Sequence, residues 1–187
     1  MRRAWLVLAV AVVLPGCAYY ALVEPGPREM GGFYRVDPQI AWSVRAQGKM
    51  EMWTVDGPLL QQLRFYQGLQ PGRTLFVGRA TDEETPRYEK GMRANDIADF
   101  VLASLEHAGA TDVTLDTLRP APFGDWSGFR FEFDYLNRDG LAYRGLGLGA
   151  VDGEDRLHLV LYLGTREHYF DRHREAVERL LASIETI

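Results

Sequence analysis

The segment at residues 129–135 constrains the fold more than any other part of this 187-residue chain. Four aromatic residues alternate there with three charged ones, in the order Phe129, Arg130, Phe131, Glu132, Phe133, Asp134 and Tyr135. This is the two-residue period of a strand in a sheet with one buried face. Turn sequences at 137–140 and 152–155 lead into two further apolar stretches, 141–151 and 156–163. The sequence therefore predicts three consecutive antiparallel strands.

Two amphipathic helices are predicted beside these strands. Apolar side chains recur at helical spacing over residues 95–108, and Gly109 supplies the stop signal. A longer helix is predicted over residues 166–183 at the end of the chain. Its apolar stripe consists of Phe170, His173, Val177, Leu180, Leu181 and Ile184. Both stripes need an apolar surface to cover.

The first part of the domain gives less regular signals. Short strands are predicted at residues 40–44, 50–55 and 74–77. A short helix is predicted from Pro58 to Gly68, with an apolar stripe of Leu59, Leu60, Leu63 and Tyr66. Residues 81–91 are polar and have no period, so we expect a loop there.

These elements together predict the α+β fold class. We expect a two-layer structure in which an antiparallel sheet carries its helices on one face, including the long C-terminal helix. The order of elements, with Trp42 after an early strand and a final amphipathic helix, resembles the Mog1/PsbP-like α+β folds over residues 34–187. This resemblance implies an accessory or binding protein. It implies no role for individual residues.

The N-terminus has the three parts of a secretory signal. Arg2 and Arg3 precede an apolar run at residues 4–14, and small residues follow before a cleavage point. The run is too short to span a bilayer, which needs about 20 apolar residues. Leu14-Pro15-Gly16-Cys17 resembles the lipobox of bacterial lipoprotein precursors, although Pro15 stands where Ala or Ser is expected. The resemblance implies that Cys17 becomes the lipid-modified first residue of the mature chain.

The lipobox resemblance also implies a place in the cell. The protein would be anchored to a membrane through its N-terminal lipid, an acyl group such as palmitate. Because Ala18 follows Cys17 instead of Asp, the resemblance implies the periplasmic face of the outer membrane. The alternative is ordinary cleavage after Ala18, which would release a soluble protein. The expected domain organisation is a signal peptide at 1–16, the lipidated Cys17 with a flexible tether at 17–32, and a single α+β domain at 33–187.

Charge and cysteine content exclude several classes of function. The chain has 26 acidic and 21 basic residues, a formal net charge of −5, and removal of the signal peptide takes away two more positive charges. Nucleic acid is therefore not an expected partner. Cys17 is the only cysteine. Once it is acylated, neither a disulfide nor a cysteine nucleophile is available.

No motif in the sequence predicts catalysis or a cofactor. The glycines in Gly145-Leu146-Gly147-Leu148-Gly149 do not have the spacing of a dinucleotide loop. They are predicted to share one face of a strand, where a helix, a backbone or a ligand could approach closely. His168 and His173 are five residues apart, whereas two metal ligands on one helical face lie three or four apart. Because His173 lies on the apolar stripe of the C-terminal helix, it is predicted to be partly buried in the core.

The remaining candidates also favour a structural role. His107 and His158 belong to no metal-binding pattern, and the acidic clusters at 82–84 and 152–155 lack the ligand spacing of a calcium loop. We expect the acidic clusters to be solvated turns. The sequence thus predicts no metal site and no cofactor.

Two hypotheses about function follow. The first is an accessory or binding module that holds an envelope protein or a small apolar ligand. It predicts a groove lined by Trp53, Trp126 or the glycine face. The alternative is an envelope hydrolase with a dispersed site, which requires a histidine bonded to Ser, Asp or Glu in a cleft.

The lipobox resemblance generates the first testable prediction. Cells that express the full chain should incorporate labelled palmitate into it, and Cys17→Ser should abolish the label because the thioether cannot form. The measurement is metabolic labelling followed by membrane fractionation. A wild-type protein that takes up no label and fractionates as soluble would refute the lipid anchor.

Overall fold

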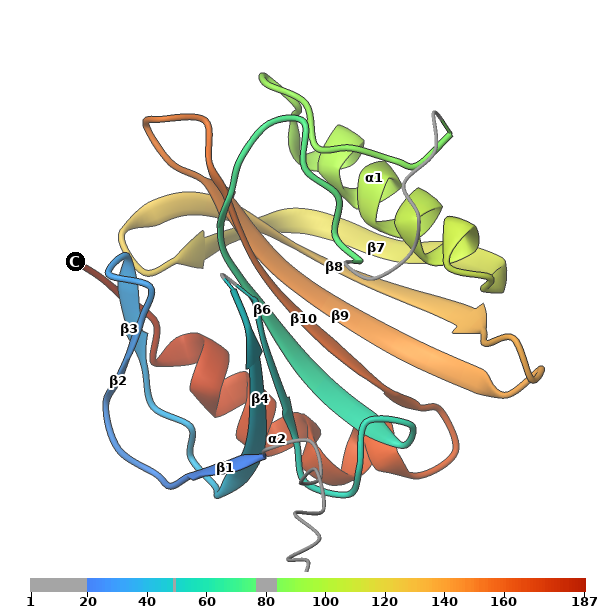
Figure 1. The fold of residues 1–187 in the computed structure, drawn as a ribbon, viewed down its shortest axis with the longest axis horizontal. Coiled ribbons are helices and arrows are strands. Elements are labelled where there is room, and N and C mark those ends of the chain that lie inside the picture. Colours follow the sequence, from blue (N-terminus) through green and yellow to red (C-terminus); the bar gives the residue numbers. More distant parts are fainter. Residues whose placement is uncertain (1–19, 49, 77–83) are drawn as a thin grey trace, which may run out of the picture.

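A large antiparallel sheet forms the centre of the molecule in the computed structural model, which describes residues 20–48, 50–76 and 84–187 (Figure 1). Its eight strands, in order across the sheet, are β1 (Ala21–Val23), β4 (Trp42–Gln47), β5 (Met50–Thr54), β6 (Gln61–Leu69), β10 (Leu157–Thr165), β9 (Ala142–Val151), β8 (Trp126–Leu136) and β7 (Thr111–Phe123). A small sheet consists of β11 (Glu185–Thr186), β3 (Tyr34–Val36) and β2 (Arg28–Met30). The helices are α1 (Ala94–His107) and α2 (Tyr169–Ala182). The α+β class is confirmed.

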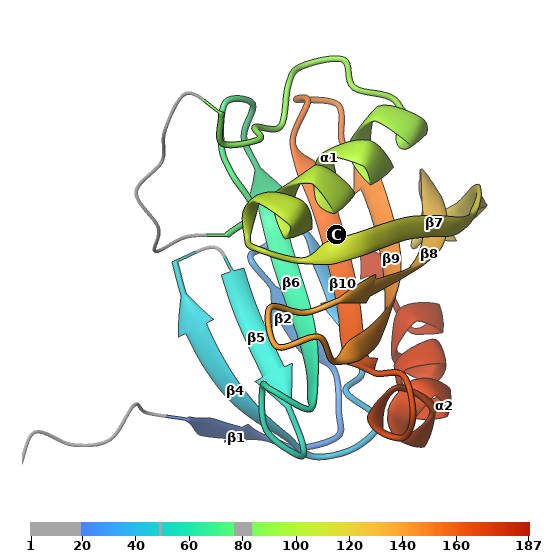
Figure 2. The same cartoon turned by 90° about the vertical axis from the view of Figure 1, so that its right-hand side faces the viewer.

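The two helices lie on opposite faces of the large sheet, which corrects the prediction that both cover one face (Figures 1 and 2). Leu159 and Leu161 of β10 pack in one cluster with α1, whereas Val160 and Tyr162 pack in the other cluster with α2. Every residue of β10 is buried. A strand with two apolar faces needs cover on both sides, so the second helix cannot share the face that α1 covers.

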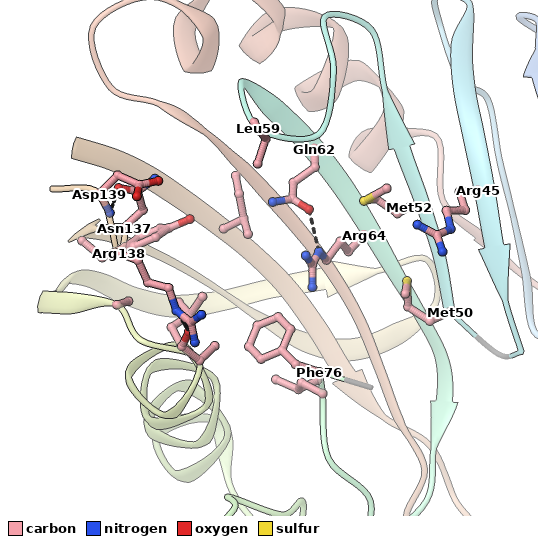
Figure 3. A pocket seen from close by; sticks show the side chains of 16 residues that line it. Arg45, Met50, Met52, Leu59, Gln62, Arg64, Phe76, Asn137, Arg138 and Asp139 are labelled. Carbon is pink, nitrogen blue, oxygen red and sulfur yellow. Dashed lines mark hydrogen bonds between the residues drawn. The ribbon is translucent and has the colours of Figure 1, made fainter. Parts of the chain in front are cut away.

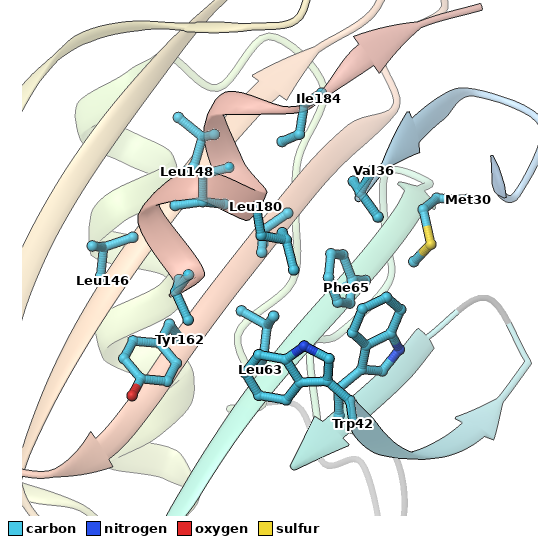
Figure 4. Close-up of a cluster of buried hydrophobic side chains, with 14 of the residues drawn as sticks. Met30, Val36, Trp42, Leu63, Phe65, Leu146, Leu148, Tyr162, Leu180 and Ile184 are labelled. Atoms are coloured by element: carbon cyan, nitrogen blue, oxygen red, sulfur yellow. The ribbon is translucent and has the colours of Figure 1, made fainter. Parts of the chain in front are cut away.

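The core on the α2 face combines the helix with side chains from β2, β3 and β4 (Figure 4). Leu180 of α2 is fully buried there, as predicted for the C-terminal stripe. Trp42, Trp53 and Met30 are also fully buried. Met30 belongs to β2, so the small sheet helps to close this core.

The core on the α1 face is built from the alternating aromatic residues of β8. Phe129, Phe131 and Phe133 stack along the strand, with ring centroids 6.1 and 5.8 Å apart. Each of them pairs across the strands with a glycine of β9, as Phe129↔Gly149, Phe131↔Gly147 and Phe133↔Gly145. A Cβ at Gly145 or Gly147 would overlap the ring of its partner. Phenylalanine side chains of the neighbouring strand therefore fill the space beside these glycines, which corrects the prediction that a helix, a backbone or a ligand approaches there.

The long periodic elements were predicted correctly. The three strands β8, β9 and β10 form consecutive antiparallel pairs, and the two helices differ from their predicted bounds by a few residues. Early strands are confirmed at β4 and β5. Residues 84–91, the described part of the predicted loop, contain no helix or strand.

The short helix predicted from Pro58 to Gly68 is wrong, because this segment contains strand β6. The i, i+3 spacing of Leu60, Leu63 and Tyr66 fits a helix, but Leu63 and Tyr66 lie on opposite faces of the sheet, in different clusters. Backbone pairing with β5 and β10 on either side outweighs the local pattern. Residues 74–76, in the strand predicted at 74–77, also form no strand.

The flexible tether predicted at 17–32 is wrong for its described part. β1 pairs with β4, and β2 pairs with β3. The prolines and glycines of this segment indicated flexibility, but its backbone hydrogen bonds and the buried side chain of Met30 fix it to the domain. Cys17 and the predicted signal peptide lie outside the described residues. In the described part, neither helix is long and apolar enough to cross a membrane.

Packing between β8 and β9 generates the second prediction. Gly147→Ala should lower the free energy of unfolding by about 1–3 kcal/mol, because the new Cβ overlaps Phe131. Gly153→Ala is a matched control, since no atom lies within 4 Å of its Cβ position, and should change stability by less than about 0.5 kcal/mol. Urea denaturation measures both. Equal effects of the two substitutions would contradict the packing role of Gly147.

Candidate functional site

The candidate site is a groove of about 550 Å³ on the α1 face of the large sheet (Figure 3). It lies beyond the C-terminal end of α1, over the half of the sheet that contains β5 and β6. Its lining residues also come from β4, β10 and the turn between β8 and β9. α1 covers β7 and β8 instead, so this half of the face stays open.

The floor of the groove is apolar because of the alternation along β5 and β10. Met50 and Met52 point into the groove from β5, whereas Trp53 belongs to the core on the other face. Leu163 adds to the floor from β10, and Leu105 adds a side chain from α1. Methionine side chains adapt to the shape of what they contact. The floor can therefore accommodate an apolar group.

Three arginines line the same groove. Arg45 comes from β4, Arg64 from β6 and Arg138 from the turn after β8 (Figure 3). Asp139 is the only acidic lining residue among those that the structure describes. Within the described ranges, no carboxylate forms an ion pair with any of the three guanidinium groups. The groove is thus cationic, although the chain as a whole has a net charge of −5.

Local contacts hold two of these guanidinium groups in place. Arg64 lies 4.9 Å above the ring centroid of Phe76, and its Nε donates a hydrogen bond to Oε1 of Gln62 at 2.8 Å. Arg138 Nε donates to the carbonyl oxygen of Ala108 at the end of α1, at 2.8 Å. A Cβ at Gly109 would overlap Arg138, and Gly109 has a φ of +96°. The glycine that stops α1 therefore also lets Arg138 reach the helix end.

Tyr135 adds a phenol to the wall of the groove. Its side chain is buried in the α1-face core, and burial raises its pKa well above the ordinary value. The phenol is therefore neutral at physiological pH. The groove thus combines an apolar floor and a neutral hydroxyl group with three arginines and one aspartate.

The groove does not lie where the sequence predicts it. Trp53 is fully buried, and Trp126 packs with its ring centroid 4.7 Å from that of His158. The glycine face is filled by the phenylalanines of β8. None of these predicted lining residues faces the groove. Met50 and Met52 are two residues apart on β5, and Gln62 and Arg64 are two residues apart on β6, so each pair shares one face of the sheet. This spacing was the signal that could have located the groove.

His158 is buried in a cluster of aromatic side chains. Its Nε2 lies 3.0 Å from Oδ2 of Asp152, in the turn between β9 and β10, and Arg156 Nε donates to the same oxygen at 2.7 Å. Phe33 and Trp126 each lie 4.7 Å from His158 between ring centroids. Burial by itself would raise the pKa of Asp152, but the hydrogen bonds from His158 and Arg156 hold it far below its ordinary value.

A second histidine forms a similar pair on the α2 side. Nε2 of His173 lies 2.5 Å from Oδ2 of Asp56, and Arg172 contacts Oδ1 of the same carboxylate at 3.0 Å. His173 is 9% exposed, as predicted for a histidine on the core stripe. His168 is exposed before the start of α2. Each histidine–aspartate pair links two segments of the folded chain, and neither histidine lines the groove.

The other predicted candidates lie apart from the groove. His107 Nε2 contacts Oγ1 of Thr85 at 3.3 Å. In the turn at 152–155, Asp152 is buried against His158, which corrects its expected solvation, whereas Glu154 is exposed. Asp82 and Glu83 lie outside the described residues. Over 20–48, 50–76 and 84–187, no three His, Cys, Asp or Glu side chains gather closely enough to hold a metal ion.

Comparison with known proteins identifies the fold class. No model of a known protein family and no curated protein sequence matches the chain. Among solved structures, the chain has the fold of cyanobacterial PsbP. The solution structure of PsbP (CyanoP) from Synechocystis sp. PCC 6803 matches with a TM-score of 0.54 and 12% identity, over 96% of this chain and 98% of that chain. The PsbP-like fold predicted by resemblance is therefore confirmed.

The pair formed by Asp152 and His158 generates the third prediction. The pKa of Asp152 is lower in the folded protein than in the unfolded chain, where it is about 3.9. This difference stabilises the fold above that unfolded pKa, and the stabilisation is lost as pH falls toward the folded pKa. Asp152→Asn should lower the free energy of unfolding at pH 7 by about 1–3 kcal/mol.

The difference between Asp152→Asn and wild type should shrink progressively below about pH 4. Urea denaturation at a series of pH values measures it. Glu154→Gln is the matched control, because the Glu154 side chain in the same turn is 73% exposed. A difference that stays constant from pH 7 to pH 3 would show that the charge of Asp152 does not stabilise the fold.

Proposed function

We propose that this protein is a lipid-anchored binding module of the bacterial cell envelope, held at the periplasmic face of the outer membrane. Cys17 carries the anchor, and the groove takes a small apolar ligand that bears an acidic group. One observation carries the proposal: the groove joins an apolar floor to three arginines on an acidic protein. The PsbP-like fold supplies the scaffold and does not define the ligand.

The size of the groove favours a small ligand over a folded protein. Its volume of about 550 Å³ lies within the range of about 300–1,000 Å³ that is typical of small-molecule sites. Met50, Met52 and Leu163 offer apolar contacts on the sheet side. A hydrocarbon chain placed against them would lose contact with water, which stabilises the complex by about 25 cal/mol per Å² of buried apolar surface.

The arginines favour an anionic group on that ligand. A guanidinium binds a carboxylate or phosphate through two parallel hydrogen bonds, which are stronger than hydrogen bonds between neutral groups. Arg64 is already oriented by Phe76 and Gln62, so little side-chain freedom is lost on binding. Within the described residues, no protein carboxylate competes for the three arginines through an ion pair. A cationic ligand is disfavoured by the same charges.

The groove favours binding over the hydrolase alternative. A hydrolase of the dispersed type needs a nucleophile and a histidine paired with a carboxylate in one cleft. The described lining of the groove includes neither a serine nor a histidine. The two histidine–aspartate pairs are packed into the structure elsewhere. A membrane anchor also supports a binding role, because it keeps the module at high local concentration beside its membrane partners.

Ligand binding is the fourth prediction, with dodecanoate as the probe. Isothermal titration calorimetry of residues 17–187 should detect dodecanoate below its micellar concentration and no binding of dodecyltrimethylammonium, which has the same chain and the opposite charge. The double variant Arg45→Ala/Arg64→Ala should weaken dodecanoate binding about tenfold, because two partners of the carboxylate are lost.

Arg35→Ala is the matched control for the arginine variant. Arg35 is exposed on β3, in the small sheet, and does not line the groove. This control should bind dodecanoate as the wild type does. Equal binding of the anionic and cationic probes, or an equal loss in the control and the double variant, would refute the proposed ligand class.

A further inference from the structure

Exposed apolar side chains gather at one end of the large sheet. Six large apolar residues are exposed in the described part of the chain: Tyr20, Leu22, Val55, Leu59, Leu141 and Ile187. Leu59 is 80% exposed and Leu22 is 66% exposed. Single exposed apolar residues are ordinary on protein surfaces, but their concentration in one region marks an interaction surface. All of them except Ile187 belong to the end described next.

Strand register places these residues at the same end of the strands, which we call the β1 end of the sheet. A single row of residues crosses the sheet from β1 to β9. It begins with the pairs Leu22↔Ser43 and Ser43↔Thr54 and continues through the hydrogen bond from Thr54 to Gln61. It ends with the pairs Gln61↔Gly164 and Gly164↔Arg144. Val55 and Leu59 lie in the loop that follows Thr54, and Leu141 lies just before β9. The hydroxyl of Tyr143 also donates to the carbonyl oxygen of Leu59. β1 and this loop lie at the bottom in both views (Figures 1 and 2).

The chain reaches Cys17 from this same end. Tyr20 directly precedes β1, and Cys17 is three residues before Tyr20. Three residues span at most about 11 Å when fully extended. An acyl chain attached to Cys17 therefore brings a membrane surface close to the β1 end. This short distance favours a bilayer over a protein partner as the occupant of the apolar surface.

The opposite end of the sheet has a different character. The turn between β9 and β10 is acidic there, and Glu154 is exposed. Lys90 lies in the neighbouring segment and forms an ion pair with Asp155 at 3.0 Å. None of the six exposed apolar residues of the described chain lies in these segments. Charged side chains of this kind remain hydrated, so we expect this end to face the solvent.

We infer that the β1 end of the sheet lies against the surface of the anchoring bilayer, with Leu22, Val55, Leu59 and Leu141 in contact with lipid. This inference rests on the anchor of the proposed function. Apolar side chains gain free energy when they enter the interfacial region of a bilayer, even where no segment spans it. Leu59 also lines the groove, so the groove opens beside the lipid surface. A ligand drawn from the membrane would pass Leu59 first.

Tryptophan quenching by brominated lipids tests this orientation. Residues 17–187 are coupled through Cys17 to a maleimide phospholipid in vesicles of phosphatidylcholine and phosphatidylglycerol, with or without dibrominated acyl chains. Leu59→Trp and Leu22→Trp each place a tryptophan at the β1 end, and both positions are exposed, so the fold tolerates them. Glu154→Trp places one at the opposite end. The emission of the native tryptophans is subtracted.

The expected result is at least threefold more quenching for Leu59→Trp and Leu22→Trp than for Glu154→Trp. Equal quenching at the two ends would overturn the inference. Because the coupling to lipid is chemical, this result does not depend on acylation in cells. A wild-type protein that takes up no palmitate, or that binds no dodecanoate, would refute the proposed function. Neither outcome changes the quenching result, so the two failures are distinguishable.

Discussion

The contact between the phenylalanines of β8 and the glycines of β9 determines much of this fold. Side chains on directly paired residues compete for the same space on a sheet face, and here one partner of each pair has no side chain. The rings of Phe131 and Phe133 can therefore lie across β9 and form a continuous apolar surface with β10. This surface fixes the register of the strands, since a shift of one residue would place the rings on the other face. α1 packs on the surface that results.

The opposite face of the same strands is held by a different combination of forces. Leu146 and Leu148 of β9, which alternate with the glycines, pack against α2. At the edge of α2, Arg130 of β8 donates to both carboxylate oxygens of Glu178 at 2.6 Å, and this hydrogen bonding lowers the pKa of Glu178. The charged residues that alternate with the phenylalanines thus orient the second helix. The alternating sequence of β8 thereby positions a helix on each face of the sheet.

Periodicity over a long segment made part of the fold predictable, and the limits of that signal explain the rest. β8 and α2 each repeat their pattern over several turns or pleats, so no other structure fits the residues. β6 has mixed signals, because Leu60, Leu63 and Tyr66 also match a helix, and only pairing with β5 and β10 decides between them. The groove depends on β6 and was therefore missed. The apolar Val160 and Tyr162 indicate that β10 is covered on both faces, but the prediction of one covered face followed the alternation of β8 instead.

The groove exists because the aromatic surface ends before the sheet does. On the half of the α1 face that contains β4 and β6, the side chains include Arg45 and Arg64 instead of phenylalanines. A helix laid over them would bury guanidinium groups that have no carboxylate partner in the described structure, at a high cost in desolvation. This half therefore remains open to a ligand that brings its own negative charge. In the proposed orientation, Leu59 connects the open half to the membrane, so the anchor and the binding surface belong to one side of the molecule.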